Sequence, residues 1–143
     1  HTIFDCDWSS DVCSSDLRKM NFIRQWISRQ RPYVFENSSI PKIVGYFSPI
    51  DPFAVSFGPW VFCREKFPEK TLRHETIHYH QQLELLFVIH WLLYVLFHLK
   101  GMLTEKDGEN AYRQNPFELE AYDNDSKEDY LESRKPFAWI KYI

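Results

Sequence analysis

Residues 73–82 read RHETIHYHQQ, and this stretch decides the fold because it sets His74, Glu75 and His78 on one predicted helix. Residues four apart lie on the same helical face, about one turn apart, so both imidazoles can reach one cation. Zn²⁺ favours such nitrogen ligands at about 2.0 Å. Glu75 is displaced by about 100° around the helix and can therefore face the open position of the metal. The alternative is two surface histidines that flank a solvated acid.

A third ligand is expected further along the chain, because hydrolytic zinc sites combine three protein ligands with a water. The continuation HYHQQLEL (78–85) lacks the third histidine of an HExxHxxGxxH site, so a glutamate from a second helix is expected instead. The stretch NPFELEAY (115–122) offers Glu118. Glu120 is the alternative ligand, and the two glutamates lie about 200° apart on a helix, so both cannot serve.

The pair HETIHYHQQ and NPFELEAY resembles the small gluzincin-like zinc metallopeptidases of the thermolysin clan and the short HExxH…ExxA proteins of bacteria and phages. The resemblance covers residues 74–122 and implies a zincin-like fold, a Zn²⁺ cofactor and a peptide or protein substrate. In that pattern Glu118 is the third ligand, and Ala121 is the small residue that lets the two helices approach. Tyr122 stands where the family has Asp or Asn, so Tyr122 or Asp123 is expected to support a histidine ligand.

The reaction implied is hydrolysis of a peptide bond, with the metal polarising the carbonyl and lowering the pKa of the attacking water. Glu75 would take the proton of that water and pass it to the leaving amine. The oxyanion needs a further hydrogen-bond donor, for which His80, Tyr112 and Tyr122 are candidates by residue type.

In this clan an edge strand before the active-site helix pairs with an extended peptide substrate. By order in the chain that strand would fall within residues 54–63, with Val55, Phe57 and Val61 as the residues that meet the substrate. The alternative role for these residues is packing within the sheet.

The remaining pattern predicts an α+β fold, in which a small antiparallel sheet of two or three strands precedes the active-site helix and the glutamate-bearing helix. The expected strands are KIVGYF (42–47), AVSF (54–57) and WVFCREKF (60–67). The expected helices are a basic amphipathic helix from residue 21 that docks on the core or on a membrane, a helix over 69–100 with a break near 86–90 and a glycine cap at Gly101, and a helix over 115–134. Residues 104–110 are expected as a loop, and the apolar tail 135–143 as an extended segment packed on the core.

The first 17 residues, HTIFDCDWSSDVCSSDL, resemble a translated sequencing adapter and are predicted to be non-native and disordered. Residues 18–143 then form a single zincin-like domain, with Met20 as a plausible start. Without the four aspartates of the first segment, 17 basic residues face 16 acidic ones, which gives no indication of a nucleic-acid partner. Cys63 stays as a single cysteine, compatible with a cytoplasmic location. The sequence leaves the oligomeric state open.

Residues 83–99, LELLFVIHWLLYVLFHL, are the most apolar stretch of the chain. Its 17 residues reach only the lower limit for a membrane span, and Glu84, His90 and His98 interrupt it. A buried core helix is therefore predicted, with peripheral membrane contact as the alternative. The corresponding alternative function is a non-catalytic zinc-binding or membrane-peripheral interaction module.

Overall fold

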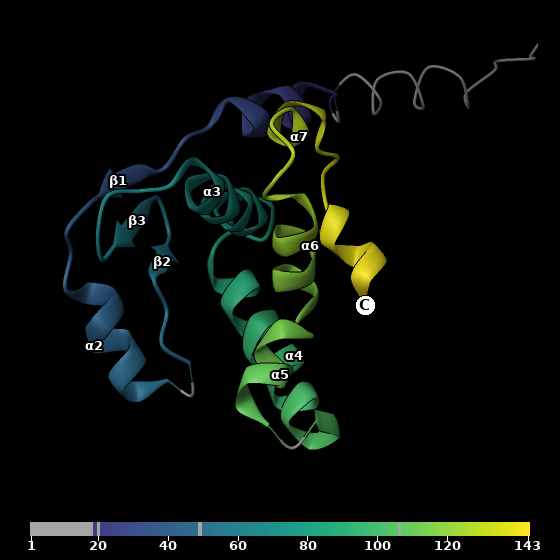
Figure 1. Ribbon diagram of the computed structural model, residues 1–143. Coiled ribbons are helices and arrows are strands. Elements are labelled where there is room, and N and C mark those ends of the chain that lie inside the picture. Colours follow the sequence, from purple (N-terminus) through teal and green to yellow (C-terminus); the bar gives the residue numbers. More distant parts are fainter. Residues whose placement is uncertain (1–18, 20, 49, 106) are drawn as a thin grey trace, which may run out of the picture.

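A computed structural model describes residues 19, 21–48, 50–105 and 107–143. The predicted adapter-like segment 1–17 and Met20 lie outside these residues. The described chain is α+β, as predicted: a three-stranded sheet is followed by a series of helices. In Figure 1 the sheet and helix α2 lie on one side of helix α3, and helices α4, α5 and α6 lie on its other side.

The predicted N-terminal helix is present at residues 21–29. Its Ile27 is buried, and Arg24 Nη2 donates a hydrogen bond to the carbonyl of Ser133 at 2.9 Å. The helix therefore docks on the C-terminal part of the chain, whereas Phe22 and Trp26 on its outer face stay exposed.

The sheet consists of β1 (Tyr33–Phe35), β2 (Ala54–Phe57) and β3 (Trp60–Cys63), in the order β1-β3-β2. β2 pairs with β3 in antiparallel fashion, as predicted, but β1 pairs with β3 in parallel. The sheet is therefore mixed and not purely antiparallel. β2 is an edge strand, and β3 is the central strand.

The predicted strand KIVGYF is wrong, because these residues belong to helix α2 (Ile40–Phe47). The helix begins at a serine pair, where Ser38 Oγ accepts a hydrogen bond from the backbone N–H of Ile40. Pro41 lies in the first turn, where its missing N–H has no intrahelical acceptor to lose. These start signals outweigh the β-branched composition of the segment.

The predicted helix 69–100 is broken into α3 (Glu69–Glu84) and α4 (Val88–Glu105), which are bent by 113° relative to one another. At the break, Leu86 and Phe87 both adopt positive φ, 52° and 58°. Such a conformation is unfavourable for residues with large side chains and persists only where packing holds it. The predicted break near 86–90 is thus present, and it begins one residue earlier, at Leu85.

Helix α4 does not end at Gly101 as predicted, and residues 108–110 of the predicted loop belong to helix α5 (Gly108–Arg113). Gly101 is buried at the contact between the two helices. A Cβ added there would lie 3.0 Å from both Cα and O of Ala111, so the glycine permits close packing of α4 on α5.

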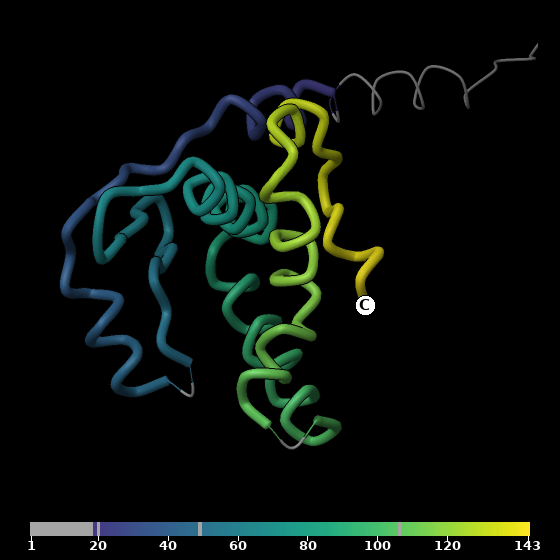
Figure 2. Tube along the Cα trace, viewed as in Figure 1, coloured from purple at the N-terminus to yellow at the C-terminus, as the bar shows by residue number. Residues whose placement is uncertain are grey.

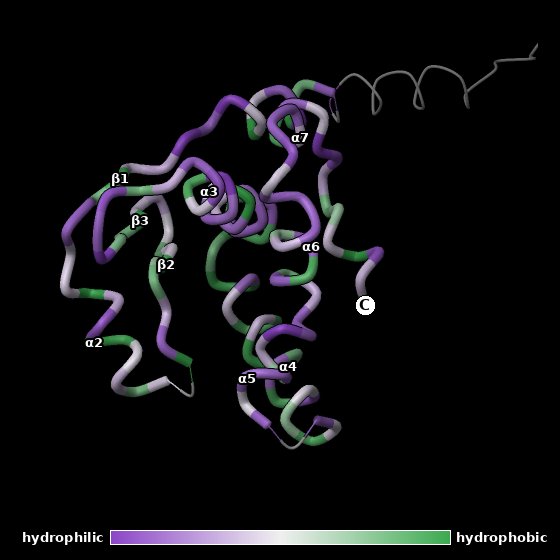
Figure 3. The backbone as a smooth tube through the Cα atoms, viewed as in Figure 1, coloured by the Kyte–Doolittle hydropathy of each residue, from purple (hydrophilic) through white to green (hydrophobic). Residues whose placement is uncertain are grey.

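The prediction of a buried core helix over 83–99 is wrong. Within α4 only His90 and Gly101 are buried. A stripe of exposed apolar residues runs along the helix, and Figure 3 shows the apolar positions recurring over its length. We call it the α4 apolar stripe; it comprises Val88, Ile89, Leu92, Val95, Leu96, Leu99, Met102 and Leu103.

None of the described helices has by itself both the length and the apolar character that a membrane crossing requires; α3 and α4 have them only as a bent pair.

The glutamate-bearing helix α6 (Pro116–Asn124) is shorter than the predicted 115–134, and a separate helix α7 (Tyr130–Ser133) follows it. The predicted N-cap is present, since Asn115 accepts a hydrogen bond from the backbone N–H of Phe117. The C-terminal tail is not extended but forms the 3₁₀ helix η1 (Ala138–Tyr142). It packs on the core as expected, with the Trp139 and Phe117 rings 4.7 Å apart, and Figure 2 shows this segment running beside α6.

Candidate metal centre

Three side chains from two helices converge inside the protein. His74 and His78 come from α3, and Glu118 comes from the first turn of α6. One ligand atom from each lies within 4.8 Å of the other two, and all three residues are buried. The sequence placed the histidines one turn apart on a helix, and the packing of α6 on α3 brings the glutamate to them.

Small and polar residues allow this approach of α6 to α3. Ala121 of α6 is fully buried, and its single methyl group takes up little space in the core. The facing stretch 74–82 of α3 is buried throughout, although it is mostly polar. Buried polar groups are stable only when they are paired, so each of these side chains needs a partner across the interface.

The separations of the three side chains fit one metal ion. The Nε2 atoms of His74 and His78 lie 3.2 Å apart, and each lies 3.4 Å from an oxygen of Glu118. Ligand atoms at about 2.0 Å from a tetrahedral Zn²⁺ are separated by roughly 3.3 Å. Glu118 Oε2 is also a buried oxygen with no hydrogen-bond partner among the described residues. The donor set and its spacing therefore fit a divalent ion that prefers nitrogen and oxygen ligands.

Each of the three side chains is supported from behind. His78 Nδ1 lies 2.9 Å from Gln81 Oε1, and His74 Nδ1 lies 3.5 Å from Asp125 Oδ2. The hydroxyl of Tyr94 on α4 donates a hydrogen bond to Glu118 Oε1 at 2.8 Å. Partners of this kind orient the ligands of a metal site and increase their basicity.

The charges at the site depend on one another. Burial by itself lowers the pKa of His78, but the Glu118 carboxylate outweighs it and raises the pKa to about 9. Burial likewise opposes ionisation of Glu118, yet the two imidazoles hold its pKa below the ordinary range. In the metal-free protein the Glu118 carboxylate is thus balanced by the protonated imidazole of His78, and a bound dication would take the place of that proton.

Glu75 lies beside this cluster at the meeting point of two cavities. The larger cavity, ≈ 690 Å³, is lined by Glu75 and His74, and the smaller, ≈ 190 Å³, by Glu75, His78 and Glu118. Burial raises the pKa of the Glu75 carboxyl, an effect that the two histidines partly oppose. A carboxylate whose pKa is raised and that faces the cavity binds a proton more readily than an exposed one, which suits a proton acceptor.

Tyr112 and Tyr122, which were predicted as candidate hydrogen-bond donors to the oxyanion, both line the larger cavity. Tyr122 packs its ring edge-on against the imidazole of His74, with 4.6 Å between the ring centroids. Tyr112 lines both cavities. Burial raises the pKa of both phenols, so both keep their proton and can donate hydrogen bonds.

Three other predicted residues lie away from the cluster. Glu120 is fully buried on the opposite side of α6, where it pairs with Arg134. Asp123 is exposed. His80 is buried with its Nε2 3.1 Å from the carbonyl of Gln30, and it lines neither cavity.

The three predicted substrate-strand residues have different environments. Val55 of β2 lines the smaller cavity. Phe57 is exposed at the end of β2, 5.6 Å from the Trp91 ring. Val61 lies on the central strand β3 with no exposed surface, so it cannot meet a substrate strand, and this part of the prediction is corrected.

The supporting residues Gln81, Asp125 and Tyr94 were missed at the sequence level. Helical spacing could have found two of them: Gln81 is three residues after His78, and Asp125 is seven after Glu118, which returns to the same helical face. Tyr94 carries no such signal, because it comes from α4, 24 residues before Glu118.

No protein family, curated protein sequence or solved structure matches this chain.

Proposed function

We propose that this protein is a zinc-dependent peptidase of minimal gluzincin type, in which His74, His78 and Glu118 hold the metal. The observation that supports the proposal is the convergence of these three ligands, at separations that suit Zn²⁺, beside a buried glutamate that opens onto a cavity. A purely structural zinc site requires no acid at the position of Glu75.

When bound, Zn²⁺ would polarise the scissile carbonyl and lower the pKa of the attacking water. Glu75 accepts the proton from that water, because its carboxylate faces the cavity in which the substrate lies. It then donates the same proton to the leaving amine. Burial helps the first step, because it raises the pKa of the Glu75 carboxyl and so makes its carboxylate a stronger base.

Among the candidate donors to the oxyanion, Tyr112 is the best placed. It lines both cavities together with Glu75, whereas Tyr122 lines only the larger one and His80 lines neither. Its phenol stays protonated, so its O–H can donate a hydrogen bond to the developing negative charge.

The free edge of β2 is suited to bind an extended peptide. The backbone N–H of Arg64 donates to the carbonyl of Phe53, and hydrogen-bonded pairs alternate along an antiparallel ladder. The backbone groups of Ala54 and Ser56 therefore point away from β3. Both residues line the smaller cavity, so a peptide paired with this edge would pass beside Glu75.

The test is cleavage of a peptide library by the zinc-loaded wild type and by Glu75→Gln. We expect Glu75→Gln to retain zinc and to lose about 10²- to 10⁴-fold in kcat, the usual contribution of a general base. Glu69→Gln, an exposed change on the same helix, is the control and should cleave at the wild-type rate. Unchanged cleavage by Glu75→Gln would contradict the role of Glu75 as the general base.

A second candidate function is a non-catalytic zinc-binding module at a membrane surface, and the α4 apolar stripe favours it. Exposed apolar patches of this kind mark interaction or membrane sites. It predicts that the wild type sediments with phosphatidylcholine–phosphatidylglycerol vesicles and that a Leu92, Leu96 and Leu99 triple serine variant does not. Ile140→Ser, exposed on η1, is the control. Wild type that stays in the supernatant would exclude this candidate.

A further inference from the structure

Gln81 is fully buried in the last turn of α3, and its side-chain amide forms hydrogen bonds at both its nitrogen and its oxygen. Its Nε2 donates to the backbone carbonyl of Phe117 at 3.0 Å and to Glu120 Oε2 at 3.0 Å. Neither partner has a proton to give, since a backbone carbonyl and a carboxylate only accept. The –NH₂ end of Gln81 must therefore face α6, and its oxygen must face His78.

The orientation of this amide determines which nitrogen of His78 carries a proton. Gln81 Oε1 lies 2.9 Å from His78 Nδ1 and can only accept, so Nδ1 must be the protonated nitrogen. In the neutral imidazole this leaves the lone pair on Nε2, the atom that lies 3.2 Å from His74 Nε2 and 3.4 Å from Glu118 Oε1.

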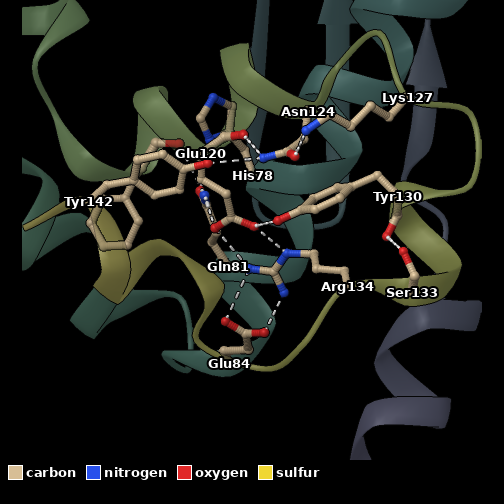
Figure 4. A network of polar contacts seen from close by, with 11 residues as sticks. His78, Gln81, Glu84, Glu120, Asn124, Lys127, Tyr130, Ser133, Arg134 and Tyr142 are labelled. Atoms are coloured by element: carbon tan, nitrogen blue, oxygen red, sulfur yellow. Dashed lines mark hydrogen bonds and ion pairs between the residues drawn. The ribbon is translucent and has the colours of Figure 1, made fainter.

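Glu120 is itself held in place by charge. Arg134 donates to its two oxygens, from Nε at 2.6 Å and from Nη2 at 3.1 Å, and the Tyr130 hydroxyl donates to Oε1 at 2.8 Å. Arg134 also pairs with Glu84 of α3, and both side chains are almost completely buried. Figure 4 shows this chain of contacts from Glu84 through Arg134, Glu120 and Gln81 to His78.

We propose that Gln81 and Glu120 are positioning residues of the metal centre, which fix His78 with Nδ1 protonated and Nε2 free for the ion. This inference rests on the metal centre of the proposed function. It gives a role to the second glutamate of FELEAY: Glu118 binds the metal, and Glu120, on the opposite face of α6, orients the amide that orients the histidine. Arg134 donates a hydrogen bond to each oxygen of Glu120, so both oxygens act as acceptors.

The test compares zinc affinity in Gln81→Met, Gln81→Glu and Gln82→Met. Met removes the acceptor for His78 Nδ1, so the dissociation constant for zinc should rise about 10- to 100-fold, the usual effect of losing such a partner. A buried, protonated Glu keeps one acceptor and one donor, so Gln81→Glu should stay within a few-fold of the wild type. Gln82 is the matched control: it is an equally buried glutamine that bonds Gly58 and Ser56 instead of a histidine.

Nitrogen-15 NMR of the zinc-loaded wild type gives a second readout, which requires no variant to fold. A proton on His78 Nδ1 with zinc on Nε2 is expected. Zinc on Nδ1, or wild-type affinity in Gln81→Met, would overturn the inference while the metal centre stands. A wild type that binds no zinc would instead remove the proposed function itself.

Discussion

Most of the buried polar side chains around the site have hydrogen-bond partners, whereas His90 on α4 has none within the described part of the chain. Both of its ring nitrogens are buried without a hydrogen-bond partner among the described residues. Its ring packs against Phe117, with 4.5 Å between the centroids, in a cluster of aromatic side chains. Burial, reinforced by the positive charge on His78, lowers the pKa of His90 to about 3.

This environment predicts a loss of stability in acid. The unfolded chain binds the His90 proton below its ordinary pKa of about 6.5, but the folded protein does so only near 3, so stability falls as the pH drops between these values. His90→Leu should remove this contribution. From pH 7 to 4.5, in the presence of a chelator, we expect the wild type to lose about 2 kcal/mol more unfolding free energy than the variant.

Urea unfolding at both pH values measures the difference. The chelator ensures that the release of a metal does not contribute to it. Identical losses in the two proteins would show that His90 does not titrate as its surroundings imply.

The metal ligands could be predicted from the sequence because each lies in a short motif whose spacing along the chain is recognisable. His74 and His78 are one helical turn apart, and Glu118 follows in a second motif. Support of a histidine ligand was predicted for Tyr122 or Asp123 from the family pattern, whereas the structure places Asp125 beside His74. Asp123 lies about 140° around the helix from Glu118, so helical phase would have selected Asp125.

Among the elements, those with local signals were predicted and those set by distant contacts were not. β2 and β3 have β-branched and aromatic residues around a Gly-Pro turn, and both are present. β1 was not predicted, because its three residues are ordered by parallel pairing with β3, which lies 27 positions further along the chain. The break between α3 and α4 contains neither Gly nor Pro, so only the length of the helical pattern indicated it.

The close contact between α4 and α5 predicts that a methyl group added at Gly101 destabilises the protein. Gly101→Ala would place a methyl group 3.0 Å from the backbone of Ala111, which must then shift. Overpacking costs about 1–3 kcal/mol. Alanine recovers roughly 0.8–1 kcal/mol of helix propensity. We expect a net loss of about 1 kcal/mol in unfolding free energy, measured by urea denaturation.

Lys100→Ala, an exposed change on the same helix, is the control and should be close to neutral. A Gly101→Ala protein more stable than the wild type would mean that α4 and α5 are not packed this closely.

At the scale of the whole molecule, one buried arginine joins segments that are distant in sequence. Arg134, just after α7, pairs with Glu84 at the end of α3 and with Glu120 in α6. All three side chains are at most 3% exposed, so the pairing charges are cut off from water. The C-terminal segment is in this way tied to the same helices that carry the metal ligands.

Removing Arg134 should therefore strongly lower the free energy of unfolding. Arg134→Met leaves two buried carboxylates without their partner, and we expect a loss of about 3–5 kcal/mol in unfolding free energy. Arg113→Met is the matched control, because it breaks an exposed Arg–Glu pair with Glu109. Such a surface pair contributes at most about 1 kcal/mol. Equal effects of the two changes in urea unfolding would contradict the buried network.

The most direct test of the metal centre is the zinc content of the protein after dialysis against buffered zinc, measured by mass spectrometry. We expect about one zinc per chain in the wild type and in Glu75→Gln. Glu118→Gln should bind zinc at least about a hundredfold more weakly, since it loses a ligand and not only a supporting partner. A wild type without zinc, or a Glu118→Gln variant that binds it equally well, would contradict the assignment of His74, His78 and Glu118.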